Sequence, residues 1–223
     1  VAIDGPAGAG KSTIARRLAG RLGFLYIDSG AMYRAVGLWA LRAQVDLADA
    51  HRLEQLALAA RIELEPGNSK VLLNGEDVTE AIRTAEVSQA ASRVSTIGGV
   101  RRAMVEQQRR LGAQASVVME GRDIGTVVFP DADIKIFLDA DQAVRADRRL
   151  REAAETGASV DGEEMARQIR ERDQRDRTRL EAPLVQAPDA VYVDSTGLSI
   201  EQVEESILKI IRERTSNGKE RTS

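Results

Sequence analysis

The chain has 223 residues, a formal net charge of −3 and no cysteine. The lack of cysteine excludes disulfides, thiolate metal sites and cysteine nucleophiles, and the single histidine, His51, excludes a histidine-rich metal site. The acidic balance and an aromatic content of 3% speak against nucleic-acid binding. No apolar run approaches the roughly 18 residues of a membrane span. We therefore expect one cytoplasmic α/β domain with a small insertion, acting as a monomer.

The first expected element is an apolar strand over residues 1–4, which leads through a glycine-rich segment into a helix over 11–22. The segment matches the phosphate-binding pattern Gly5-x-x-x-x-Gly10-Lys11-Ser12. In this pattern the glycines let the backbone approach phosphate oxygens, the lysine reaches the β- and γ-phosphates, and the serine hydroxyl ligates Mg²⁺. An ordinary glycine-rich turn is the alternative, but the strand before it and the amphipathic helix after it favour nucleotide binding.

Apolar strands and amphipathic helices continue to alternate along the chain. The pattern predicts further strands near 24–27, 117–120, 134–138 and 191–193, and helices over 31–43, 100–111, 143–154, 163–180 and 199–214. Such alternation indicates an α/β fold with a parallel sheet covered on both faces. Ligands of these folds collect at the carboxyl ends of the strands, where the glycine-rich segment, residues 28–30, residues 120–123 and Asp139 all lie.

Two segments interrupt this alternation. Residues 61–79 read as two alternating strands around a turn, which predicts a small antiparallel insertion. Residues 155–162 form a polar link between two helices, and we expect either a mobile lid or a plain connector. We place the core in 1–45 and 100–215, the insertion in 46–99 and the lid at about 151–163 within the core. Residues 216–223 are predicted to be a disordered tail.

Three polar groupings are candidates for chemistry. In residues 28–34, Ser29 and Arg34 could meet a second phosphate, although a helix cap is the simpler interpretation. Glu120 and Asp139 each end an apolar strand and compete for a water-mediated Mg²⁺ role.

The third grouping is the arginine-rich run 167–179. Arg172, Arg175, Asp176 and Arg179 share one helix face. A solvent-exposed face is the favoured interpretation, and an anion pocket is the alternative.

Taken together, six motifs resemble the bacterial cytidylate kinases, and the resemblance covers nearly the whole chain. They are Gly5-Pro6-Ala7-Gly8-Ala9-Gly10-Lys11-Ser12, residues 28–34, 74–79, 82–84, 121–130 and 172–177. This resemblance implies a three-layer P-loop fold with a five-stranded parallel sheet, an enlarged monophosphate-binding region and a mobile lid. It also implies that ATP phosphorylates CMP or dCMP with Mg²⁺ as cofactor. The nearest alternative is a kinase for another acceptor such as UMP, and a regulatory nucleotide-binding module is the alternative from another class.

The resemblance also implies which residues bind ATP, CMP and Mg²⁺ and which are catalytic. ATP phosphates would be held by Gly5, Pro6, Ala7, Gly8, Ala9, Gly10, Lys11, Ser12 and Thr13. CMP would be bound by Ser29, by Arg34, Arg122 and Arg179 at its phosphate, by Ser92, Arg101 and Asp123 at cytosine, and by Arg172 and Asp176 at the ribose. The catalytic set would be Lys11, Arg122, Arg148 and Arg179, with Arg148 facing ATP from the lid. Ser12 would ligate Mg²⁺, with Glu120 acting through water, although some members of the family carry Asp at the position of Glu120.

Overall fold

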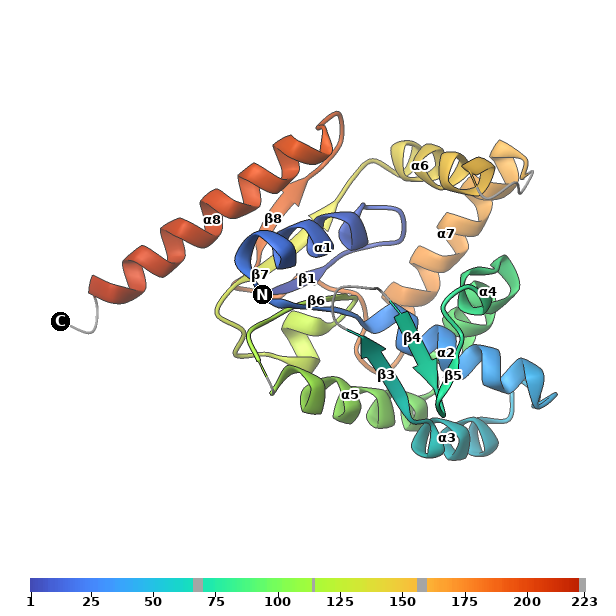
Figure 1. Cartoon of the computed structure of the whole chain (residues 1–223). Helices are drawn as coiled ribbons and strands as arrows, with labels where there is room; N and C mark the ends of the chain where they lie inside the picture. The colour runs from blue at the N-terminus through green and yellow to red at the C-terminus, as the bar shows by residue number, and fades with distance from the viewer. Residues whose placement is uncertain (66–69, 114, 156–159, 221–223) are drawn as a thin grey trace.

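The main sheet is built from five parallel strands. The computed structural model describes residues 1–65, 70–113, 115–155 and 160–220 (Figure 1). The strands are β1 (Ala2–Asp4), β2 (Leu25–Asp28), β6 (Val117–Gly121), β7 (Lys135–Asp139) and β8 (Val191–Asp194), and they lie side by side in the order β2-β6-β1-β7-β8. The predicted five-stranded parallel sheet is therefore confirmed.

The register of the strands brings acidic side chains to one edge of the sheet. Asp28 pairs with Glu120, Asp4 with Gly121, and Asp139 with Asp194. Because all five strands run in the same direction, these residues lie together at the carboxyl edge, where ligands bind in open α/β sheets.

Helices cover both faces of this sheet. On one face α1 (Lys11–Leu22) and α8 (Ile200–Glu220) pack onto the strands through Ile14, Leu18 and Ile207. On the other face Val105 of α5 (Gly98–Gly112) packs against Met119, together with the π-helical turn η2 (Ile124–Val128). The three layers bury the sheet, as continuous apolar strands require.

The insertion packs against the helix α2 (Ser29–Arg42), which precedes it in the chain. Its antiparallel sheet has the order β3 (Ile62–Glu65), β4 (Lys70–Leu73) and β5 (Glu76–Asp77), with β5 added to the two predicted strands. Two helices that the sequence pattern did not predict, α3 (Ala50–Ala59) and α4 (Ala85–Val94), pack with α2, the turn η1 (Ala81–Arg83) and the small sheet in one core. The predicted turn at 66–69 lies outside the described residues.

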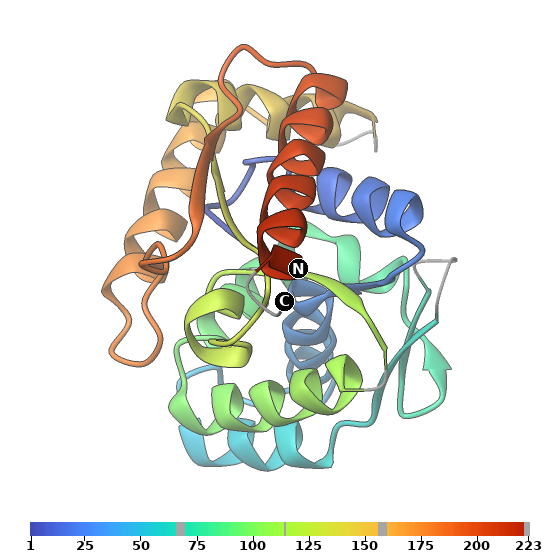
Figure 2. The ribbon, with the colours of Figure 1, turned by 90° about the vertical axis from the view of Figure 1, so that its left-hand side faces the viewer.

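Two helices stand over the carboxyl edge of the main sheet. They are α6 (Gln142–Glu155) and α7 (Gly162–Thr178), which pack against each other. In the view of Figure 2, α7 lies on the opposite side of the molecule from the small sheet. The centre of the predicted lid, residues 156–159, lies outside the described residues, so its mobility stays a prediction.

The C-terminal helix α8 continues to Glu220, so residues 216–220 are helical where the sequence predicts a disordered tail. The polar residues at this end are compatible with helix because hydroxyl groups donate to preceding carbonyls. Thr215 Oγ1 donates to Ile211 O at 2.9 Å, and Ser216 Oγ donates to Arg212 O at 2.9 Å. Within the described residues, no helix combines the length and the apolar character that crossing a membrane requires.

Candidate active site

The loop between β1 and α1, residues 5–10, is shaped for an anion and is called the phosphate loop below. Three of its glycines have positive φ: Gly5 at 150°, Gly8 at 76° and Gly10 at 88°. A Cβ atom at Gly5 would lie 1.9 Å from the carbonyl oxygen of Leu138, so the loop rests directly on β7. The loop leads directly into the first turn of α1, and a glycine-rich loop at a helix N-terminus is the arrangement that binds phosphate through backbone N–H groups.

Lys11 lies at the centre of this arrangement. Its side chain is buried, and Nζ donates to the carbonyl oxygen of Pro6 at 2.7 Å. Burial, followed by repulsion from Arg122, holds the pKa of Lys11 well below its usual value. A phosphate beside this ammonium would favour its charged form.

Glu120, at the end of β6, faces the first turn of α1. Its carboxylate accepts a hydrogen bond from Tyr26 Oη at 2.6 Å. Burial, then repulsion from Asp28, raises the pKa of Glu120, while Lys11, Tyr26 and the Ser12 hydroxyl oppose the shift. A divalent cation bound here would compensate both the burial and the repulsion, so Ser12 and Glu120 fit a magnesium site.

Asp139, the second acidic candidate for the magnesium site, contacts Ala140 and Arg145 instead of the cleft. Its carboxylate accepts from the backbone N–H of Ala140 at 2.8 Å and lies 3.8 Å from Arg145 Nε. Its carbonyl oxygen accepts from Ser195 Oγ at 2.9 Å. Of the two acidic candidates, only Glu120 lines the cleft that contains Lys11.

Residues 28–34 form both a helix cap and a wall of the cleft. Asp28 caps α2 by accepting from the N–H of Ala31 at 2.9 Å, and it also pairs with Arg34 at 2.8 Å. Ser29 Oγ donates to the carbonyl oxygen of Glu120 at 2.6 Å. The two interpretations of this motif therefore hold together: the cap is formed, and Ser29 and Arg34 line the cleft.

A buried ion pair stands further into the cleft, where Arg101 of α5 donates to the carboxylate of Asp123. The guanidinium of Arg101 lies 5.7 Å above the ring of Tyr33, a cation–π contact that sequence reasoning missed. The hydroxyls of Tyr33 and Ser92 are buried without a hydrogen-bond partner within the described residues. Tyr33 lines the cleft but Ser92 does not, although its neighbours Ala91 and Ser95 do.

The arginine-rich helix α7 faces the cleft, so the favoured interpretation of a solvent-exposed face is wrong. Asp176 is buried and binds Arg122 Nε at 2.9 Å, and Arg179 lies 3.9 Å from Asp176 and 3.8 Å from Asp123. Arg175, assigned to the same face, does not line the cleft. The ion pairs reach across from the β6–η2 loop, which explains why the cleft side of so polar a helix is buried while its other residues are exposed or half-buried.

Arg172 is another residue of this helix that lines the cleft. Its Nε is buried without a hydrogen-bond partner within the described residues. Burial, followed by repulsion from Arg122, lowers its pKa to about 9. A buried guanidinium with a cation beside it is a site that an anionic ligand would stabilise.

Arg148 and its neighbour Arg149 point to different places. Arg148 donates to Ser195 Oγ at 2.9 Å and to Ser195 O at 2.8 Å, beside the phosphate loop, and does not line the cleft. Arg149 does line it and pairs with Glu152 at 2.7 Å. The predicted catalytic role of Arg148 stays a prediction, and Arg149 is a cation that sequence reasoning missed.

These groups line one cleft whose charge differs from that of the whole chain. Its described lining has seven cationic side chains against five carboxylates, namely Lys11, Arg34, Arg101, Arg122, Arg149, Arg172 and Arg179 against Asp28, Glu120, Asp123, Glu152 and Asp176. The chain as a whole has a net charge of −3. A phosphate loop that faces a second, arginine-lined site in a parallel α/β sheet defines a P-loop kinase of the nucleoside monophosphate kinase class.

Comparison with known proteins identifies the family. A sequence model described as cytidylate kinase matches residues 1–213. A cytidylate kinase of Solibacter usitatus is 64% identical over 99% of this chain and 95% of its own length. One of Pelotomaculum thermopropionicum is 52% identical over 98% and 96%. The chain belongs to the cytidylate kinase family, which confirms the resemblance seen in the motifs.

Two further matches add context. A bifunctional pantoate ligase/cytidylate kinase of a Synechococcus strain is 46% identical over 96% of this chain, which spans 40% of that longer protein. A crystal structure of an uncharacterized protein from Eubacterium ventriosum superposes with a TM-score of 0.53 at 13% identity, covering 95% of this chain and 96% of the other. This last likeness concerns the fold alone.

Proposed function

We propose that the described cleft carries out the cytidylate kinase reaction, the transfer of the γ-phosphoryl group of ATP to CMP or dCMP. A phosphate oxygen of the monophosphate forms a bond to the γ-phosphorus while the bond to the β-phosphate oxygen breaks, which gives ADP and CDP or dCDP. The acceptor phosphate is already an anion, so no general base is needed. Positioning and charge neutralisation supply the catalysis. One chain lines both halves of the cleft, and we propose that a monomer is sufficient.

In the donor half, the phosphate loop would hold the phosphates of ATP through its backbone N–H groups. Lys11 would exchange its hydrogen bond to Pro6 O for the β- and γ-phosphate oxygens. The burial that lowers the pKa of Lys11 in the free enzyme also strengthens its attraction to a phosphate, because few water dipoles screen the charges.

The magnesium ion would be held by the Ser12 hydroxyl and, through water, by Glu120. When bound, Mg²⁺ neutralises charge on the β- and γ-phosphate oxygens. Within the described residues, no group of three or more acidic, histidine or cysteine side chains could hold a metal alone. This agrees with Mg²⁺ taking most of its ligands from water and phosphate, as it usually does.

In the acceptor half, arginines would receive the phosphate of CMP. Arg122, Arg179 and Arg34 are each held by a carboxylate, and Arg172 has a buried Nε without such a partner. The carboxylates keep the guanidinium groups in place before the substrate arrives, which lowers the cost of ordering them. Arg172 and Asp176 would also reach the ribose hydroxyls.

Cytosine would be read by Asp123, Arg101 and Ser92. A carboxylate accepts from the N4 amino group of cytosine, and a guanidinium donates to its N3 and O2 atoms. Uracil has an acceptor in place of that amino group, which would face the carboxylate of Asp123 and be repelled. The buried, unpartnered hydroxyls of Ser92 and Tyr33 are further groups that a bound nucleotide could satisfy.

The observation that carries this proposal is that the two halves share one cleft: Lys11, beside the phosphate loop, lines the same cleft as Arg122 and Arg172. The γ-phosphate of ATP and the phosphate of CMP, bound by these side chains, would therefore lie in the same cleft.

A coupled assay of ADP release with CMP, dCMP and UMP tests the proposal. We expect rapid release with CMP and dCMP and slower release with UMP. Faster turnover of UMP would contradict the base-reading assignment, and no release with any monophosphate would contradict the kinase reaction itself.

A further inference from the structure

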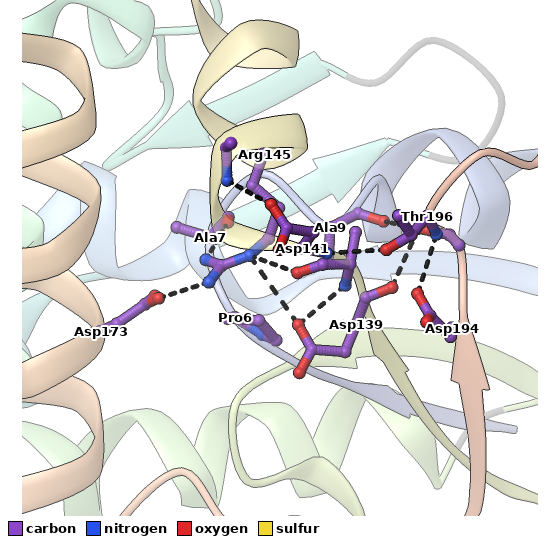
Figure 3. Close-up of polar contacts among 12 residues, drawn as sticks. Pro6, Ala7, Ala9, Asp139, Asp141, Arg145, Asp173, Asp194 and Thr196 are labelled. Carbon is purple, nitrogen blue, oxygen red and sulfur yellow. Dashed lines mark hydrogen bonds and ion pairs between the residues drawn. The ribbon is translucent and has the colours of Figure 1, made fainter. Parts of the chain in front are cut away.

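Arg145, on the inner face of α6, is a buried arginine outside the catalytic set. Its guanidinium reaches three separate elements (Figure 3). NH1 donates to the carbonyl oxygen of Ala7 in the phosphate loop at 3.0 Å, and Nε donates to the carbonyl oxygen of Ala140 at 2.9 Å. NH2 lies 2.7 Å from Asp173 Oδ2 on α7. One side chain therefore connects the donor half to the helix of the acceptor half.

The backbone of α6 at the same residue is packed onto the phosphate loop. A Cβ atom at Gly8, whose φ is 76°, would lie 2.8 Å from the carbonyl oxygen of Arg145 and 3.0 Å from its Cβ. A side chain at Gly8 would collide with α6, so the loop and the helix fit without a gap. A shift of the phosphate loop at Ala7 or Gly8 must therefore move Arg145 as well.

Asp173 lies on α7 among the residues that face the acceptor. It follows Arg172 directly and lies one helical turn before Asp176, which binds Arg122 at 2.9 Å. Asp173 is buried, and its Oδ1 has no hydrogen-bond partner within the described residues, while its Oδ2 pairs with Arg145. A buried ion pair with one oxygen unsatisfied is a weak source of stability.

We propose that Arg145 and Asp173 form a positioning link that couples occupancy of the phosphate loop to the placement of α7, so that a bound donor strengthens acceptor binding and the reverse. Neither Arg145 nor Asp173 lines the cleft. The link acts because Arg145 contacts the loop by side chain and by backbone, while Asp173 is one residue away from Arg172 on α7. This inference rests on the proposed function, since it needs both substrates to bind in this cleft.

The test measures thermodynamic coupling, which a merely structural ion pair would not change. The Kd of adenylyl imidodiphosphate, a nonhydrolysable ATP analogue, is determined by calorimetry with and without saturating CMP. The ratio of the two values is the coupling factor, and by linkage it equals the effect of the analogue on CMP. We expect a factor of about five or more in the wild-type enzyme.

Two variants break the link from opposite ends. Asp173→Asn removes the charge with little change in shape, and Arg145→Lys keeps the charge but cannot span three acceptors. We expect either variant to bring the coupling factor close to one, and the double variant to lose no more than the single ones. The matched control is Glu204→Gln, which removes a buried partner of Arg17 at 2.6 Å on α8, away from α7.

Three results would overturn the link: no coupling in the wild-type enzyme, wild-type coupling in both single variants, or a further loss in the double variant. If Asp173→Asn does not fold, as thermal unfolding would reveal, Arg145→Lys alone decides. Failure of the proposed function looks different, because the wild-type enzyme would then release no ADP with CMP at all.

Discussion

The two halves of the cleft are built in different ways. The donor half is mostly backbone: one continuous loop, residues 5–10, with three glycines at positive φ and a single buried lysine behind it. The acceptor half consists of side chains from four separate elements. Arg34 comes from α2, Arg101 from α5, Arg122 and Asp123 from the β6–η2 loop, and Arg172 and Asp176 from α7, with Arg179 directly after its last residue.

This difference in construction has an energetic consequence. Backbone N–H groups are held by the fold itself, so the phosphate loop needs no counter-ions. In the acceptor half, Arg34, Arg122 and Arg179 are each paired with a carboxylate, and burying these charges without the carboxylates would be costly. Asp123 and Asp176 therefore have two tasks, since they stabilise the empty site and face the substrate.

The first and largest prediction concerns the one side chain on which the donor half depends. In Lys11→Ala we expect kcat at saturating ATP to fall by about 10²–10³-fold, because a charged donor to the phosphoryl group is lost. The midpoint of thermal unfolding should not fall, because the depressed pKa of Lys11 means that burial disfavours its charge. Steady-state kinetics and thermal unfolding measure the two effects.

Lys135 is the matched control, since it is also buried but lies away from the cleft. Its Nζ donates to Asp189 Oδ1 at 2.9 Å. Lys135→Ala should lower the unfolding midpoint while leaving kcat close to wild type. A near-normal kcat in Lys11→Ala would contradict this prediction and would show that the backbone of the phosphate loop alone positions the phosphates of ATP.

The second prediction uses Asp4, which joins the two halves. Asp4 ends β1, the strand before the phosphate loop, and its carboxylate accepts from the N–H groups of Ile124 at 2.8 Å and Gly125 at 2.7 Å. Burial raises its pKa from 3.8 to about 6, although these two N–H groups oppose the shift. At a pH between these two pKa values, Asp4 is protonated in the folded state and ionised in the unfolded state.

The free energy of unfolding should therefore fall as the pH rises from about 4 to about 6, by about 3 kcal/mol from this group, and then level off. Urea titrations of the wild-type enzyme and Asp4→Asn across this range measure the difference. The variant should lack this part of the slope. If the free energies of unfolding of the two proteins changed with pH in parallel, the buried charge of Asp4 would be tolerated. The contact between the two halves would then cost less free energy than the burial of Asp4 indicates.

Local sequence predicted the donor half and the main sheet because both are local. The phosphate loop is contiguous, and each buried strand is a short apolar run. The helices α3 and α4 escaped prediction because their buried residues are few or small: Leu53 and Ala57 in α3, and mainly alanine, serine and valine in α4. Such residues leave a weak apolar periodicity.

The acceptor half could not be derived from spacing, because its pairs are distant in sequence. Arg122 binds Asp176 across 54 residues, and Arg101 binds Asp123 across 22. By local pattern α7 looks solvent-exposed, and its burial depends on partners from other elements. Spacing offered Asp176 only as part of an alternative anion pocket, and the resemblance to a family assigned roles to all four residues. It did not name Tyr33, Arg149 or Arg145. Tyr33 lies within residues 28–34, one of the six motifs that carry the resemblance, and this position was the only sequence feature that pointed to it.

The third prediction tests whether Asp123 reads the base in addition to holding Arg101. In Asp123→Asn the repulsion of uracil is removed and the acceptor for the cytosine amino group is weakened. We expect the ratio of kcat/KM for CMP over UMP to fall by roughly tenfold, within the 1–3 kcal/mol that a specific base contact contributes. Kinetics with both monophosphates at fixed ATP measure the ratio.

The control for this variant is Glu106→Gln, which neutralises an exposed carboxylate on α5, the helix that carries Arg101. Glu106 pairs with Arg110 at 3.1 Å, and both side chains are exposed. The control should keep the wild-type ratio. If Asp123→Asn lowers kcat/KM equally for both substrates, then Asp123 only positions Arg101. The acceptor half would in that case resemble the donor half more closely, as a site that binds phosphate and leaves the base to other groups.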